Sequence, residues 1–249
     1  MLNKFELIFK IAKNPKEFLI DKSINCLEAF LIGVDSGLAF HEKEPINNII
    51  DRQFLNEWIF KEFIVSEEHS NRMNAFNCMS LQSYCELMTS GEEEAFDLYI
   101  KSCKEAYLAK PQSNIQAKNT TLPQRNFFEF IEFVKKRPGM YVRGWDIKIY
   151  ENIAQGYIYA EEHILKIHSE LNNELTGFKD WLDKRYPYGT GVCFSKIIEF
   201  TAVGQRLSDI EYFEEHLDMF RKKESPNAPD RTNELMVKNI LEHAQKQDE

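Results

Sequence analysis

The stretch Ser23-Ile-Asn-Cys-Leu-Glu-Ala-Phe-Leu-Ile-Gly33-Val-Asp-Ser-Gly-Leu-Ala-Phe40 decides the fold class. Its apolar residues follow one another at spacings of three and four, which places them on one face of an α-helix: Ile24, Leu27, Leu31, Val34 and Leu38. Ser23 precedes them as a suitable N-cap. Clear strand patterns are few, and no Asn-Gly or Asp-Gly dipeptide joins two alternating runs. The sequence therefore predicts an all-α protein.

The pattern returns 123 residues later, where Phe5–Phe40 lies over Phe128–His163 without a gap. Eight of these 36 positions are identical, whereas chance would give roughly two. Asp146 takes the N-cap position of Ser23, and Trp181 takes the position of Trp58. We therefore expect two copies of one helical unit.

These copies set the expected domain organisation. We expect a helical repeat unit at 1–108, a linker at 109–125, a second repeat unit at 126–223 and a closing helix at 230–247. The linker is polar and contains Pro111 and Pro123, so it has little to bury. The prediction is two pseudo-repeated lobes plus a C-terminal helix.

Several residues are predicted to have structural roles. Pro15 and Pro138 would each stop a short helix. Glycine inside a helix costs roughly 1 kcal/mol relative to alanine, so close approach of a neighbouring helix or of an aromatic side chain is the expected compensation at Gly33 and Gly156. Contact with a ligand is the alternative at these two positions. The other candidates are two core tryptophans and two residues that follow Pro138: Trp58, Trp181, Gly139 and Tyr141.

Composition narrows the function classes. The chain has 40 acidic and 31 basic residues, a net charge of −9, which argues against nucleic acid as the main ligand. It shows no signal peptide and no apolar run long enough to span a bilayer, so no membrane association is expected. Five cysteines without a CxxC pair favour a reduced, cytoplasmic chain.

No common catalytic motif is present: the sequence lacks GxSxG, Walker A and GxGxxG patterns. His163 and His168 are five residues apart, whereas helical metal sites usually pair histidines at a spacing of four. We therefore expect no metal, no cofactor and no enzyme activity. A metal-dependent hydrolase that uses His163, His168 and nearby carboxylates is the alternative.

Clusters of acidic residues are the candidate partner-binding residues. They are Glu67 and Glu68; Glu92, Glu93, Glu94 and Asp97; and Glu161 and Glu162. Such clusters can form a negative surface that captures a basic partner quickly. The alternative for any one cluster is an exposed helix face with no partner.

The second unit carries a family resemblance. It contains Phe127-Phe-Glu-Phe-Ile-Glu-Phe-Val-Lys-Lys-Arg-Pro-Gly-Met-Tyr141, then Gly156-Tyr157, Phe178-Lys-Asp-Trp181 and Arg185-Tyr186. This resembles small bacterial proteins with an RPGMY…GY…FxxW signature, found as immunity proteins of polymorphic and contact-dependent growth inhibition toxin systems. The resemblance covers about 126–223 and carries no catalytic residues. The first unit is a degenerate relative.

The resemblance implies an antitoxin that binds one cognate toxin domain in a 1:1 complex. The implied toxin is a nuclease, and more specifically an RNase. By analogy, this RNase would be a tRNA-cleaving enzyme of EndoU type. The immunity protein would block its active site or substrate cleft. A regulatory scaffold with an unrelated partner is a further alternative.

Overall fold

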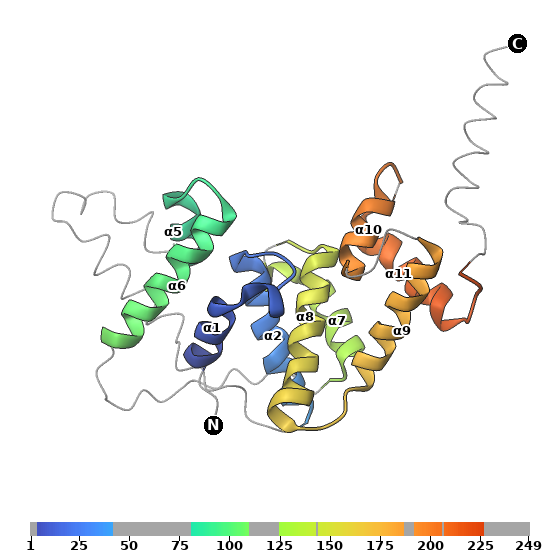
Figure 1. The fold of residues 1–249 in the computed structure, drawn as a ribbon, viewed down its shortest axis with the longest axis horizontal. Coiled ribbons are helices and arrows are strands. Elements are labelled where there is room, and N and C mark those ends of the chain that lie inside the picture. Colours follow the sequence, from blue (N-terminus) through green and yellow to red (C-terminus); the bar gives the residue numbers. More distant parts are fainter. Residues whose placement is uncertain are drawn as a thin grey trace, which may run out of the picture. The chain divides into compact units, whose positions relative to one another are not determined.

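The computed structural model describes residues 4–41, 81–109, 125–142, 144–186, 192–205 and 207–226. Within these ranges all of the regular structure is helical, which confirms the all-α prediction (Figure 1). Trp58, residues 110–124 of the predicted linker and the predicted closing helix at 230–247 lie outside the described residues.

The chain divides into two compact units, Met1–Leu171 and Asn172–Glu249, here called unit 1 and unit 2. Unit 1 contains α1 (Lys4–Lys13), η1 (Pro15–Glu17), α2 (Ile24–Phe40), α5 (Leu81–Met88), α6 (Glu92–Ala109), α7 (Phe127–Lys135), η4 (Pro138–Met140), α8 (Ile147–Tyr159) and the π-helix η5 (Ala160–Leu165). The helix α9 (Glu170–Arg185) begins at the boundary, and α10 (Phe194–Ala202) and α11 (Asp209–Arg221) follow it among the described residues of unit 2.

This division differs from the predicted lobes at 1–108 and 126–223. The physical reason lies in α2 and α8, which come from different predicted repeat units yet pack against each other in unit 1. This contact joins the first predicted lobe to residues 126–171 of the second, and the rest of the second lobe belongs to unit 2.

The order of elements nevertheless recurs along the chain. A short helix, a 3₁₀ turn and a longer helix occur as α1, η1 and α2, and again as α7, η4 and α8. Pro15 and Pro138 each begin the 3₁₀ turn, as expected for a residue that stops the preceding helix. The Ser23 side chain accepts a hydrogen bond from Cys26 N, and that of Asp146 accepts one from Ile149 N, so both predicted N-caps are confirmed.

Two glycines allow α2 and α8 to meet backbone against backbone. A Cβ atom on Gly33 would lie 2.0 Å from the carbonyl oxygen of Ile153, and one on Gly156 would lie 2.0 Å from that of Phe30. Phe30 and Ile153 each lie three residues before the glycine of their own helix, so the contact is reciprocal. The predicted close approach of a neighbouring helix is thus confirmed at both positions.

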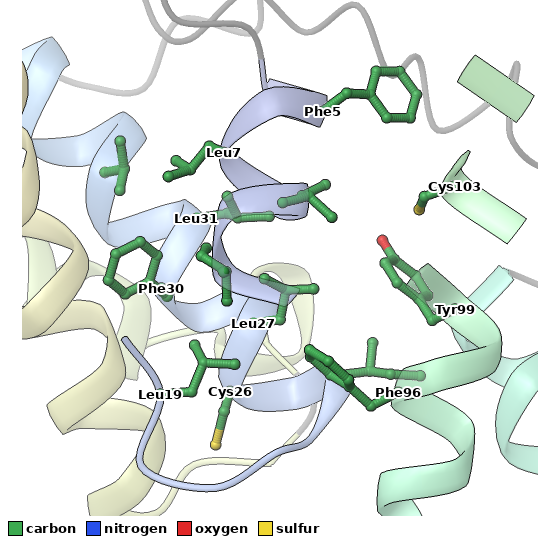
Figure 2. Packing of buried hydrophobic residues seen from close by; sticks show 14 of the residues in the cluster. Phe5, Leu7, Leu19, Cys26, Leu27, Phe30, Leu31, Phe96, Tyr99 and Cys103 are labelled. Atoms are coloured by element: carbon green, nitrogen blue, oxygen red, sulfur yellow. The ribbon is translucent and has the colours of Figure 1, made fainter. Parts of the chain in front are cut away.

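The main hydrophobic cluster of unit 1 joins α1, α2 and α6 (Figure 2). Phe96 and Tyr99 extend from α6 toward α1 and α2, and Phe5 of α1 packs on Tyr107 of α6 with ring centroids 5.0 Å apart. Burial of Phe5, Phe96 and Tyr99 holds the α5–α6 segment on the rest of unit 1.

Aromatic packing also forms the core of unit 2. Trp181 of α9 is buried, as predicted, and stacks on Phe178 with ring centroids 6.3 Å apart. Phe178 in turn meets Phe194 of α10 and Phe213 of α11. Phe178 therefore joins α9, α10 and α11.

The two residues predicted to be structural after Pro138 behave differently. The Tyr141 ring packs on Phe133 at 5.5 Å between centroids. A Cβ atom on Gly139 would meet nothing within 4 Å, so no close contact requires glycine there. The structural role expected for Gly139 has no steric basis.

Among the helices of the described ranges, none combines the length and the apolar character that a membrane span needs.

Candidate functional site

The first two turns of α6 present four exposed carboxylates, here called the acidic turn: Glu92, Glu93 and Glu94 in the first turn and Asp97 in the second. A helix N-terminus carries a partial positive charge, which favours acidic residues in the first turn. The opposite side of the helix supplies the buried residues Ala95, Phe96 and Tyr99, so its packing directs the acidic residues outward.

Lys22 neutralises part of the acidic turn. Its Nζ lies 2.7 Å from Asp97 Oδ2 and 3.9 Å from Glu93 Oε2. Four carboxylates against one ammonium group leave a local net charge of −3. Exposed ion pairs of this kind contribute little to stability, so the acidic residues remain accessible to a competing cation.

Glu94 differs from Glu92 and Glu93 because its hydrogen bonds close the turn before α6. Its Oε2 accepts hydrogen bonds from Ser90 N at 3.1 Å and from Ser90 Oγ at 2.8 Å. The hydroxyl and backbone donors of Ser90 lower the pKa of the Glu94 carboxyl. Glu92 and Glu93 have no such capping role in the described structure.

Glu161 does not belong to an exposed acidic surface, contrary to expectation. It lies in η5 with 7% of its surface exposed, and its Oε1 is 2.9 Å from His41 Nε2 at the end of α2. A carboxylate can only accept, so His41 donates this bond. The pair connects the end of α2 to the π-helix, and its neighbour Glu162 is half-buried.

The described structure supports neither the remaining predicted acidic cluster nor the alternative of a metal site. Glu67 and Glu68 lie outside the described residues. His163 and His168 are both exposed, and within the described ranges no group of three or more His, Cys, Asp or Glu side chains could hold a metal ion.

Two residues of the sequence signature lie on α9 and bind the segment that follows α11. Trp181 Nε1 donates to Glu224 O at 3.0 Å, and Arg185 Nη1 donates to Pro226 O at 3.1 Å. The Arg185 guanidinium also lies 5.4 Å from the centre of the Trp181 ring. Trp181 and Arg185 thus have a structural role in unit 2.

His216, which sequence reasoning missed, lies at the centre of a hydrogen-bond network in unit 2. Its Nδ1 is 2.8 Å from the carbonyl oxygen of Tyr212 and therefore carries the proton. The Tyr186 hydroxyl lies 2.8 Å from Nε2 of the same ring and 2.8 Å from the Tyr212 hydroxyl. The sequence contained one indication of this pair. Tyr212 and His216 are four residues apart, which places both side chains on one face of a helix.

The resolved pKa shifts in the described residues follow burial and capping. Burial raises the pKa of the thiols of Cys26, Cys85 and Cys103 and of the Tyr157 phenol. Hydrogen bonds lower the pKa of Glu94 and Glu211. These shifts have structural causes.

No family model, curated protein or solved structure matches the chain.

Proposed function

We propose that this chain is an immunity protein that binds a cognate toxin domain in a 1:1 complex and blocks its active site or substrate cleft. The observation that carries the proposal is the acidic turn of α6, which is exposed and has a net charge of −3 after the contribution of Lys22. The sequence resemblance supplies the class of partner.

A basic nuclease is the partner that this surface fits best. A nuclease cleft that binds phosphates carries clustered Lys and Arg residues. Carboxylates on a folded surface can imitate the charge of those phosphates and attract the cleft over several ångströms. In this proposal the chain acts in the cytoplasm and binds the toxin there; its function needs no cofactor.

Calorimetric titration with the purified toxin domain encoded by the adjacent gene tests the proposal. Nuclease activity is assayed in the same mixtures. We expect nanomolar or tighter binding, a 1:1 stoichiometry and loss of nuclease activity at equivalence. Absence of binding at micromolar concentrations would overturn the proposal.

A pair of charge-matched variants tests the role of the acidic turn. Glu92→Lys combined with Glu93→Lys changes the turn but leaves Glu94 on Ser90. The control combines Glu17→Lys with Glu132→Lys, two exposed residues outside α6, and changes the net charge equally. We expect the association rate to fall about tenfold for the first variant and to stay within about twofold for the control.

A further inference from the structure

We propose that the α5–α6 tip, formed by Leu87, Met88 and the acidic turn, is the surface that docks on a basic protein partner. This inference rests on the proposed function and specifies where the partner binds. Leu87 and Met88 end α5 and expose 71% and 62% of their surface. Large apolar side chains exposed next to a charged surface are a common feature of interaction sites.

The exposed apolar pair is confined to the last turn of α5. Leu81 and Cys85 of the same helix are buried in the core of unit 1. Thr89, Ser90 and Gly91 alone join α5 to α6, so the end of α5 that carries the apolar pair lies close to the start of α6 (Figure 1). Glu86, which is also exposed, adds a carboxylate on the α5 side.

The short connection is held by hydrogen bonds at both ends. Thr89 Oγ1 donates to Cys85 O at 2.8 Å, and Ser90 donates to Glu94 through both its backbone nitrogen and its hydroxyl. These bonds order the backbone from which the apolar side chains and the carboxylates extend. Such a surface loses less conformational freedom when a partner binds.

Charge complementarity selects the occupant. An Arg or Lys side chain of a partner can lay its aliphatic stem over Leu87 and Met88 while its cation meets Glu92 or Glu93. Methionine adapts its shape to such contacts. A second copy of this chain would bring two acidic turns together, and anionic lipid or nucleic acid would be repelled by them.

Two leucines with nearly equal exposure give a matched test. Leu87 is 71% exposed at the tip, and Leu108, at the other end of α6, is 73% exposed. Leu87→Ser and Leu108→Ser are titrated against the toxin domain encoded by the adjacent gene. We expect Kd to rise at least tenfold for Leu87→Ser and to change less than twofold for Leu108→Ser. Thermal unfolding checks that both variants are folded.

The outcomes separate the two proposals. If the wild-type chain binds the toxin domain and Leu87→Ser binds equally well, the tip is not the docking surface and the immunity proposal stands. If the wild-type chain does not bind, both proposals fail. If sedimentation shows a homodimer that Leu87→Ser dissociates, the occupant is a second copy and the assignment to a basic partner is wrong.

Discussion

At the scale of single residues, the strongest structural requirement falls on Gly33 and Gly156. The atom that a new Cβ would meet is a backbone carbonyl oxygen, which cannot rotate away as a side chain could. The two helices would have to separate, and the packing between them would be lost. The sequence position of these glycines was therefore informative: each occurs mid-helix, where glycine is otherwise unfavourable.

We predict that Gly33→Ala and Gly156→Ala each lower the free energy of unfolding by about 3 kcal/mol or more. Gly139→Ala is the control, because nothing lies within 4 Å of the new methyl group, and its effect should stay within about 0.5 kcal/mol. Urea unfolding followed by circular dichroism measures all three. Equal stability of Gly33→Ala and the control would contradict the observed helix contact.

Buried thiols provide a second test at this scale. Burial raises the pKa of Cys85 to about 12 and that of Cys103 still further. At pH 8 a thiol of pKa 12 is ionised in about one molecule in ten thousand, so it reacts slowly. We predict that native Cys85 and Cys103 resist iodoacetamide and that half-buried Cys193 is labelled before either of them. Mass spectrometry of the labelled peptides distinguishes them, and rapid labelling of native Cys85 would contradict its burial.

At the scale of elements, local sequence was sufficient to predict where α2 and α8 begin and where α1 and α7 end. Ser23, Asp146, Pro15 and Pro138 act through their own backbone neighbours, so their effect can be read without knowing the fold. Glu161 could not be placed in this way. Its burial depends on His41, which is 120 residues away, and on the π-helix at the end of α8. The adjacent glutamates Glu161 and Glu162 indicate neither the contact with His41 nor the π-helix.

The capping box of α11 makes a prediction about pH. The Ser208 side chain accepts from Glu211 N, and Glu211 accepts in return from Ser208 N and Oγ. These bonds lower the pKa of Glu211 below its unfolded value. The resulting stabilisation is complete above the unfolded pKa and is lost as the pH falls through the folded pKa.

We therefore predict that Ser208→Ala destabilises α11 by about 1 kcal/mol at pH 7. Glu211→Gln should remove the contribution of this carboxylate to the acid sensitivity of α11. Hydrogen exchange of the α11 amides at two pH values, about 6 and 3, measures both effects after correction for intrinsic exchange. Unchanged acid sensitivity in Glu211→Gln would show that the capping carboxylate does not contribute.

At the scale of the whole molecule, the internal sequence repeat divides the chain at other positions than the two compact structural units do. The repeat is visible in sequence because α1 to α2 and α7 to α8 share helix boundaries at one offset. The structural units follow helix packing instead, and the contact at Gly33 and Gly156 places both copies of that pattern in unit 1. The spacing of apolar residues predicts which face of a helix is buried. It does not predict which other helix packs on that face.

The charge of the molecule leads to the final prediction, which concerns salt. Attraction between exposed charges is screened over about 8 Å at physiological ionic strength, whereas contacts formed after docking are screened much less. If the proposed partner is a basic toxin domain, the association rate should fall roughly tenfold between about 50 and 300 mM NaCl, while the dissociation rate changes far less. Stopped-flow mixing measures the first and chase with unlabelled chain the second. The Glu92→Lys, Glu93→Lys variant should show a shallower salt dependence than the Glu17→Lys, Glu132→Lys control. An equal slope for the two variants would mean that the acidic turn does not guide the encounter and that attraction comes from the overall net charge.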